Sequence, residues 1–337
     1  MTEERLQKLE QVVKGKRVLI LLHNNPDPDA IAAGWALSYL LKKKFQIYSI
    51  LAYGGLITRA ENRTMVRLLN IPIHALETVS VNQFSVVALL DTQPQTGNTS
   101  LPPRVKPSIV IDHHGLRKST QKVDFIDIRP HYGSSATILT EYLIQAVLPI
   151  PKRIATALFY GLKTDTQNLG RHAIEADYQA AITLYQKSQL KILSQIENPE
   201  LSRDYFIDFD RALHEARIYG KAVWCDLGVL VNTDMVSLMA DFLLRFSGAQ
   251  WSLVIATHDS RLIFSLRTKR SHQNSGQLAR RLVKGLGTAG GHGRTGGGQI
   301  SLQGLPQEKS EKMQQVMQKR FLKMVGQDNT AEESLLS

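Results

Sequence analysis

Residues 17–43, "RVLILLHNNPDPDAIAAGWALSYLLKK", decide the fold class. The apolar run at 17–23 is typical of a strand that is buried on both faces of a sheet. Residues 29–43 are rich in good helix formers and predict a helix. The turn between them carries His23, Asp27 and Asp29. A buried strand that leads through a polar turn into a helix is the first half of a parallel βαβ unit.

The same alternation continues to about residue 166. Short apolar runs that alternate with helical segments predict a parallel sheet with helices on both faces. We therefore expect an α/β fold, with a parallel-sheet N-terminal domain at residues 1–185. The further strands are predicted at 46–52, 85–91 and 108–114, and the further helices at 58–70, 134–147 and 152–165.

The second half of the chain has a different texture. Residues 186–220 are polar and predict a helical connector. From residue 221 onward, apolar runs follow one another more closely, which indicates a smaller α+β C-terminal domain at 221–325. Residues 326–337 are expected to form a polar tail.

Bulk composition narrows the class of protein. The chain has 337 residues, of which 43% are hydrophobic and 21% charged, as in globular proteins. Its one cysteine, Cys225, excludes an internal disulfide and favours a reducing compartment. The first residues are charged and helix-like, and no apolar run approaches the roughly 20 residues that span a bilayer. We expect a cytoplasmic protein without a membrane partner.

The net charge of +11 favours an anionic partner, of which phosphate-bearing molecules are the commonest. Solubility alone explains such a charge equally well. No long basic run indicates a dedicated nucleic-acid-binding domain.

Acids and histidines stand where three predicted strands end. The carboxyl ends of parallel strands meet at one edge of a sheet, which is where ligands bind in open α/β folds. A further acid, Asp165, ends a predicted helix that could pack beside that edge. The candidates are His23, Asp27, Asp29, Asp91, Asp112, His113, His114 and Asp165.

Each of these residues also has a purely structural interpretation. "PDPD" suits a turn and a helix N-cap, and Asp91 could simply open a loop. Together, however, so many buried acids would repel one another strongly without a cation. Carboxylates and imidazoles without a thiolate suit Mn²⁺ or Mg²⁺, with Co²⁺ or Zn²⁺ as substitutes. The number of groups fits two ions that share one carboxylate, an arrangement used for phosphoester and phosphoanhydride hydrolysis.

The ordered set "HNNPDPDA", "LLD", "IDHHG" and "KTD" resembles the DHH phosphoesterase superfamily. The resemblance implies that His23, Asp27 and Asp91 hold one metal ion. It implies a second ion at Asp29, Asp91, His113 and Asp165, with Asp91 shared. It also implies catalytic roles for His114, facing the scissile phosphate, and for Asp112, orienting the neighbouring histidine.

Residues 287–300, "GTAGGHGRTGGGQI", formally match a dinucleotide-binding fingerprint. The context is wrong, because a helix precedes the run and a strand follows it. We expect either a flexible loop or a backbone nest that holds an anion. The run resembles the glycine-rich element of DHHA1 domains, which implies substrate binding by Arg267, Gly290, Gly291, His292 and Arg294.

The pairing of the two domains is similar to that of nanoRNase/pAp phosphatases, also called bifunctional oligoribonucleases. It implies a hydrolase with two divalent ions, Mn²⁺ first among them. The implied substrates are short single-stranded oligoribonucleotides, cut as by an exonuclease, or 3′-phosphoadenosine 5′-phosphate. A homodimer is compatible with this resemblance.

Two other substrate classes stay open, namely linear dinucleotides such as pApA and short polyphosphate, as does a non-catalytic nucleotide-binding role. Pro28, the residues after Asp91 and residues 166–171 depart from the usual family pattern. We expect Asn168 and Arg171, in the last of these segments, to influence the choice of substrate.

Overall fold

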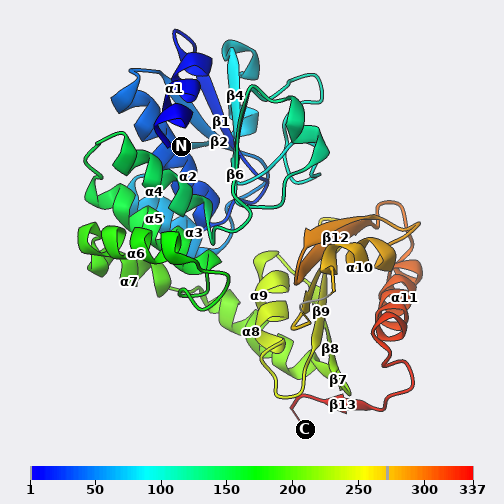
Figure 1. Cartoon of the computed structure of the whole chain (residues 1–337). Helices are drawn as coiled ribbons and strands as arrows, with labels where there is room; N and C mark the ends of the chain where they lie inside the picture. Colours follow the sequence, from blue (N-terminus) through cyan, green and yellow to red (C-terminus); the bar gives the residue numbers. More distant parts are fainter. Residues whose placement is uncertain (1, 271–272, 337) are drawn as a thin grey trace. The chain divides into compact units, whose positions relative to one another are not determined.

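The structure is a computed structural model that describes residues 2–270 and 273–336. The chain divides into two compact units, Met1–Glu200 and Leu201–Ser337 (Figure 1). Each has its own hydrophobic core.

The first unit is built on a six-stranded sheet with the strand order β3-β2-β1-β4-β5-β6. All neighbouring strands are parallel, as predicted. Two strands, β3 and β6, were not predicted, because they are only three and four residues long. The strands are β1 Val18–Leu22, β2 Ser49–Tyr53, β3 Ile73–Ala75, β4 Val86–Leu90, β5 Ile109–Asp112 and β6 Phe125–Ile128.

Strand β1 shows why the central strands are apolar throughout. All five of its side chains are buried. Val18, Ile20 and Leu22 enter the core under the helices, whereas Leu19 and Leu21 enter a smaller core on the opposite face. Successive side chains of a strand point to opposite faces, so a strand buried on both faces needs an unbroken apolar run.

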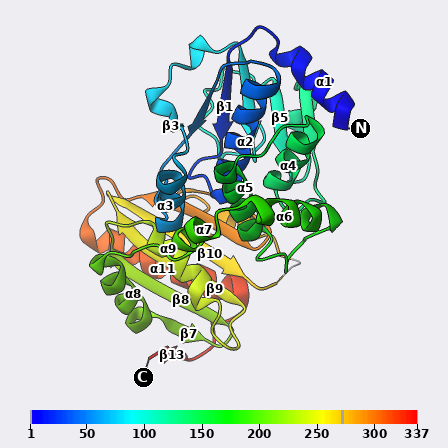
Figure 2. The ribbon, with the colours of Figure 1, turned by 90° about the vertical axis from the view of Figure 1, so that its left-hand side faces the viewer.

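Helices cover one face of this sheet, where α2 packs over β1, β2 and β4, and α4 and α5 pack against α2 (Figure 2). The opposite face is covered by loops and 3₁₀ turns rather than by the α-helices predicted there. The connections on either side of β5 are too short or too rich in proline and polar residues for long helices. The helices are α1 Thr2–Val13, α2 Pro28–Lys44, α3 Ala60–Leu69, α4 Ser135–Gln145, α5 Lys152–Asp165, α6 Glu175–Lys187 and α7 Leu190–Glu197.

The second unit contains a seven-stranded sheet of mixed direction, in the order β11-β12-β10-β9-β8-β7-β13. Its strands are β7 Arg217–Tyr219, β8 Ala222–Val229, β9 Trp251–His258, β10 Arg261–Thr268, β11 Thr288–His292, β12 Thr295–Ser301 and β13 Glu332–Ser334. Helices α8 Arg203–Glu215 and α9 Asp234–Leu243 contribute to one core, and α10 Ser275–Leu282 and α11 Gln307–Val325 to another. The predicted combination of a parallel α/β domain and a smaller α+β domain is confirmed.

The division between the units differs from the predicted boundaries. Residues 186–220 do not form a separate connector. Leu193 and Ile196 of α7 are buried in the core of the first unit, whereas Ala212 of α8 is buried in the second. The predicted polar tail contains β13, which pairs antiparallel with β7. Apolar positions at helical spacing inside a polar segment explain the first difference, and backbone pairing of a polar strand explains the second.

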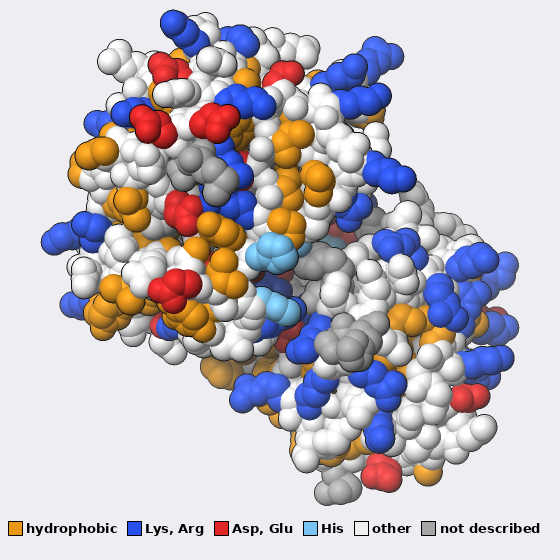
Figure 3. Space-filling model, viewed as in Figure 1, with side chains coloured by type: hydrophobic (Ala, Val, Ile, Leu, Met, Phe, Trp, Pro, Cys, Tyr) orange, Lys and Arg blue, Asp and Glu red, His pale blue; other side chains and the backbone are white. Residues whose placement is uncertain are grey.

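The positive charge is concentrated in part of the second unit. Residues 261–325 contain 13 Lys and Arg against 2 Asp and Glu, so the remaining 28 basic and 28 acidic residues cancel. Figure 3 shows many of the Lys and Arg side chains of this unit on the surface in view. The net charge of +11 is therefore a property of one segment rather than of the whole surface.

No helix among the described residues is both long enough and apolar enough to cross a bilayer.

Candidate metal centre

The sheet of the first unit reverses its direction of growth between β1 and β4, since β2 and β3 lie to one side and β5 and β6 to the other. Ligands of doubly wound sheets bind beside the carboxyl ends of the strands at such a switch point. His23 follows β1, Asp91 follows β4, and His113 and His114 follow β5. All eight metal-centre candidates of the first unit fall into three overlapping groups, with ligand atoms within 4.8 Å of one another in each group.

The first group joins His23, Asp27 and Asp91. The Nε2 atom of His23 lies 3.7 Å from Asp27 Oδ2 and 3.6 Å from Asp91 Oδ2. Asp27 is also the N-cap of α2, because its Oδ1 accepts a hydrogen bond of 2.9 Å from the Ala30 amide. One carboxylate thus serves both interpretations of "PDPD", with one oxygen capping the helix and the other facing the histidine.

The second group joins Asp29, His113 and Asp165. His113 Nε2 lies 3.1 Å from Asp165 Oδ2. Asp29 is fully buried, and its oxygens accept hydrogen bonds of 2.7 and 2.8 Å from the amides of Ser135 and Ala136. These amides belong to the first turn of α4, whose positive end favours a carboxylate. Sequence reasoning missed Ser135, although "SS" at a helix start was a signal for it.

Asp91 lies between the two groups. Its Oδ2 faces His23, and its Oδ1 lies 3.4 Å from His113 Nε2 and accepts a hydrogen bond of 2.9 Å from Ser135 Oγ. The backbone at Asp91 has a φ of +56°, in the left-handed region. Such a conformation directly after a strand redirects the side chain. Asp91 therefore has the position of a carboxylate that two ions share.

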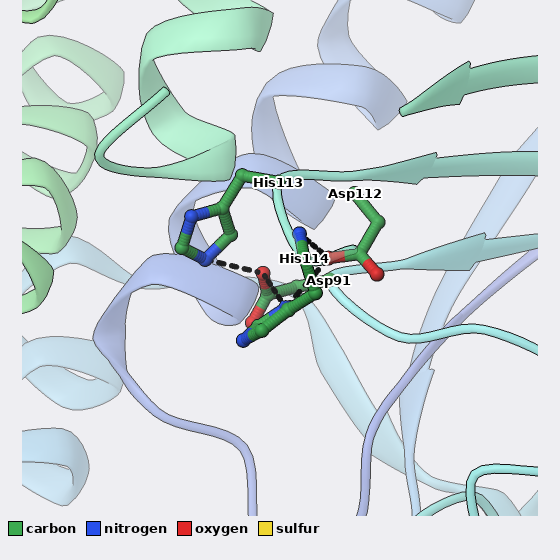
Figure 4. A group of neighbouring side chains, drawn as sticks. All are labelled: Asp91, Asp112, His113 and His114. Atoms are coloured by element: carbon green, nitrogen blue, oxygen red, sulfur yellow. Dashed lines mark hydrogen bonds and ion pairs between the residues drawn. The ribbon is translucent and has the colours of Figure 1, made fainter. Parts of the chain in front are cut away.

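Asp112 and His114 form a pair beside Asp91 (Figure 4). His114 Nδ1 lies 2.8 Å from Asp112 Oδ1, which also accepts a hydrogen bond from the His114 amide. Gln93 donates a hydrogen bond of 2.7 Å to the other oxygen of Asp112. Asp112 thus fixes the ring of His114, the histidine expected to face the substrate. Gln93 is a buried supporting residue that sequence reasoning missed.

The buried carboxylates of the candidate centre repel one another. Burial raises the pKa of Asp91 to about 7, with Asp27 adding to the rise against the opposing effect of His113 and His114. Burial, followed by the charges of Asp91 and Asp165, raises the pKa of Asp29 well above its usual value. Both shifts reflect an excess of negative charge in a site with little water. A bound cation would relieve this excess.

The histidines suit metal ligation. His113 Nδ1 lies 3.2 Å from the Tyr132 carbonyl oxygen, and His23 Nδ1 lies 2.9 Å from the Asn24 carbonyl oxygen. A carbonyl accepts only, so each Nδ1 carries a proton, which leaves each Nε2 to turn its lone pair to an ion when one is bound. His113 Nε2 is buried without a hydrogen-bond partner among the described residues. This orphaned atom and the oxygen-rich donor set fit divalent ions.

Arg129 is a buried cation that contacts the residue whose carbonyl orients His113. The Arg129 guanidinium binds Asp127 and Glu141 and lies 4.9 Å from the centre of the Tyr132 ring. Tyr132 in turn donates a hydrogen bond of 3.0 Å from its hydroxyl to Glu141. Because the Tyr132 carbonyl orients His113, Arg129 is a positioning residue for the metal centre.

Residues 166–171, which follow Asp165 and depart from the family pattern, have an unusual backbone conformation. Gln167, Asn168 and Leu169 all have positive φ, between 49° and 65°. The Nε atom of Arg171 is buried without a hydrogen-bond partner among the described residues. Such strain and an unpaired donor beside a metal ligand are typical of functional sites.

The glycine-rich run of the second unit is neither a loop nor a nest. It forms a β-hairpin in which β11 and β12 pair antiparallel around the turn Gly293-Arg294. Gly290 and Gly291 lie in β11, where strand pairing engages the backbone. Gly296 and Gly298 are needed for packing, because a Cβ on them would lie 2.5 Å from the Ser275 oxygen and 2.3 Å from the Thr288 oxygen, respectively. His292 belongs to β11, but its side chain lies outside the described part of the chain.

Arg267 is largely buried inside the second unit. Its Nε donates a hydrogen bond of 2.6 Å to Asp241, and one terminal nitrogen donates to Ser265. These contacts occupy several of its donors. The substrate-binding roles of Arg267, Gly290, Gly291, His292 and Arg294 stay predictions.

The first unit combines an open parallel α/β sheet with a cluster of carboxylates and histidines at the point where the strand order reverses. Residues 17–162 match the DHH family, N-terminal domain. Over these residues the first unit is similar to DHH family domains, which supports the broader part of the resemblance.

Two relatives and one solved structure extend this comparison. An uncharacterised protein of Methanocaldococcus jannaschii is 34% identical over 303 residues, 89% of this chain and 62% of the relative. A probable manganese-dependent inorganic pyrophosphatase of Streptococcus equi subsp. zooepidemicus is 28% identical over 182 residues, 52% of this chain and 57% of the relative. The chain thus spans about 60% of the length of these relatives. An exopolyphosphatase-related protein of Bacteroides fragilis has the same fold, with a TM-score of 0.73 at 15% identity over 95% of this chain and 97% of that one.

Proposed function

We propose that the chain is a metal-dependent phosphoric ester hydrolase that uses two divalent ions, Mn²⁺ first among them. The observation that carries the proposal is the position of Asp91, whose two oxygens face the two groups of ligands. His23 and Asp27 would complete one ion site, and Asp29, His113 and Asp165 the other. Bound ions would supply an activated water and stabilise the charge on the phosphate oxygens.

The other residues of the centre have roles that their contacts support. Asp112 holds His114 through Nδ1, and although burial lowers the pKa of His114, Asp112 and Asp91 raise it above its usual value. The rise favours the protonated form of His114, which could donate a hydrogen bond to a phosphate oxygen or a proton to a leaving group. Asp112 is a positioning residue for that histidine.

The proposed substrates are short oligoribonucleotides or 3′-phosphoadenosine 5′-phosphate. The concentration of positive charge at residues 261–325 supports an anionic substrate. A short polyphosphate or pyrophosphate is the second candidate, favoured by the similarity to a manganese-dependent pyrophosphatase. That similarity covers about half of this chain, so the first candidate is preferred on the pairing of the two units.

The test is hydrolysis of a panel that contains pAp, pApA, di- to pentaribonucleotides, pyrophosphate and tripolyphosphate, with Mn²⁺ and then with chelator. Chelator-sensitive release of mononucleotides, or of phosphate from pAp, is the expected result. Turnover restricted to pyrophosphate and tripolyphosphate would select the second candidate.

The variant that tests the two-ion centre is Asp91→Asn, which keeps the shape of the side chain and tolerates the left-handed backbone. We expect turnover to fall by about a thousandfold or more, because the shared carboxylate is lost. Calorimetric titration with Mn²⁺ should show fewer bound ions than in the wild type. Full activity in Asp91→Asn would refute the two-ion centre.

A further inference from the structure

The first unit contains a large hollow away from the metal centre. Its volume is about 870 Å³, within the range of sites that bind small molecules. It is formed by the last turns of α2, the residues that enter β2 and the first turn of α5. No acidic residue lines it.

Helix α2 presents one continuous face to this hollow. Trp35, Tyr39, Lys42 and Lys43 all line it. Their spacing of four, seven and eight residues from Trp35 places them on one side of a helix. The aromatic side chains are half-buried, and the lysines are exposed. Tyr48, which is 55% exposed, lines the hollow from the segment that leads into β2.

Only two of the four cations around the hollow stabilise the helix that carries them. Lys42 and Lys43 suit the end of α2, where the helix dipole is negative. Lys152 and Arg153, however, occupy the first turn of α5, where the dipole is positive and cations are unfavourable. The N-cap of α5 is Pro151, which offers no side-chain hydrogen bond to that turn. A bound anion would offset this concentration of positive charge.

The four cations lack acidic partners. None of Lys42, Lys43, Lys152 and Arg153 forms an ion pair with a carboxylate of the described residues. Gln189 also lines the hollow, and its Oε1 is buried without a hydrogen-bond partner in the described chain. These observations indicate a ligand that brings both negative charge and a hydrogen-bond donor.

We propose that this hollow is a second binding site, for a nucleoside phosphate. Trp35, Tyr39 and Tyr48 provide apolar, aromatic surface for the base. Lys42, Lys43, Lys152 and Arg153 bind the phosphates. Gln189 accepts a hydrogen bond from the base or the sugar.

The site is distinct from the metal centre, although the same two helices reach both. Helix α2 begins at the metal centre with Asp29 and ends at the hollow, whereas α5 begins at the hollow and ends at the centre with Asp165. The helices pack side by side (Figure 2). From Asp29 to Lys43 the helix rises by about 21 Å at 1.5 Å per residue. Both sites can therefore be occupied at once.

The intrinsic fluorescence of Trp35 provides a direct test. The other two tryptophans, Trp224 and Trp251, lie in the second unit and are only 6% and 2% exposed, so quenching by a ligand reports on Trp35. The full chain is titrated with ADP, GDP, adenosine and inorganic phosphate in the presence of chelator. We expect the nucleotides to quench the fluorescence, and adenosine or phosphate alone to bind at least about tenfold more weakly.

Variants locate the binding. Lys42→Ala with Lys152→Ala should weaken nucleotide binding by about tenfold or more, because two phosphate contacts are lost. The matched control, Lys8→Ala with Lys122→Ala, removes two exposed lysines of the same unit outside the hollow and should leave binding unchanged. Asp91→Asn should also bind normally, since it alters only the metal centre.

Three results would overturn the proposal. They are the absence of quenching by either nucleotide, equal binding by the Lys42 and Lys152 double variant, and loss of binding in Asp91→Asn. A fourth result that would refute a nucleotide site is a short oligonucleotide that binds to this hollow and is not displaced by ADP. None of these results bears on hydrolysis, so failure here leaves the proposed activity standing.

Discussion

At the residue scale, two acids of the candidate metal centre also accept hydrogen bonds from the first amides of helices. Asp27 caps α2 and Asp29 accepts the amides of α4. The positions of these acids are therefore set by helix starts, while Oδ2 of Asp27 and the second lone pairs of the Asp29 oxygens are available to ions. This double use holds a dense group of acids in place before any ion is present.

Arg171 provides a residue-scale prediction. We expect Arg171→Ala to change the ratio of turnover between pAp and a diribonucleotide by about tenfold, because an unpaired donor near the centre favours one phosphate arrangement over another. Parallel assays on both substrates measure this ratio. The control is Arg104→Ala, an exposed arginine of the same unit, which should leave the ratio unchanged. An unaltered ranking in Arg171→Ala, with Mn²⁺ binding intact, would remove Arg171 from substrate selection.

All eight metal-centre candidates could be picked out from the sequence, because they end or directly follow predicted strands, begin the helix after the first strand or end a later helix. The supporting residues could not. Gln93 and Tyr132 act through contacts that form only once the chain has folded, and neither differs locally from an ordinary polar residue, whereas the place of Ser135 at a helix start was its only signal.

At the scale of elements, the metal centre depends on the close packing of α5 against the start of α2. Gly161 allows this approach, since a Cβ there would lie 2.9 Å from the Asp29 Cα and 3.1 Å from the Pro28 oxygen. These are backbone atoms, which cannot turn aside as a side chain can. The distance between Asp29 and Asp165 is therefore set by a glycine that touches neither carboxylate.

Gly161→Ala should separate the two helices. We expect a loss of about 1–3 kcal/mol of stability from overpacking, together with weaker Mn²⁺ binding. Urea unfolding and calorimetric titration measure the two effects. Gly290→Ala, where an added Cβ meets open space, should leave the stability almost unchanged. Unaltered metal affinity in Gly161→Ala would show that helix packing does not set the geometry of the centre.

The elements missed by sequence analysis share a physical cause. Strands β3 and β6 are too short for their alternation to stand out. The glycine-rich hairpin was not predicted, because glycine is rare in strands and weakens the strand signal even where close packing requires a glycine. The turn signal was present, however, in Gly293, whose φ of +48° suits a two-residue hairpin turn.

At the scale of the whole molecule, the chain has two units and a single thiol. Cys225 is the only cysteine, and it is buried in the second unit. Burial, helped by Asp226 and Glu215, raises the pKa of its thiol to about 12. The reactive thiolate is therefore scarce in the folded protein at neutral and mildly alkaline pH.

Alkylation of Cys225 should accordingly report on the unfolding of the second unit. At pH 8.5 we expect the folded chain to react with iodoacetamide at least about a hundredfold more slowly than the urea-unfolded chain, whose thiol has its usual pKa near 8.5. Mass spectrometry at timed intervals measures both rates. Rapid labelling of the folded chain would mean that β8 opens readily.

The left-handed backbone at Asp91 has a consequence for how the gene tolerates mutation. Glycine, asparagine and aspartate adopt this conformation readily, whereas other residues pay about 1–2 kcal/mol. Asparagine and glycine codons are each one base change away from an aspartate codon. Mutation at this position therefore yields folded chains without the shared carboxylate more readily than mutation at positions with ordinary backbone geometry. In a library scored separately for cellular abundance and for activity, position 91 should keep its abundance with these two residues while losing activity with both.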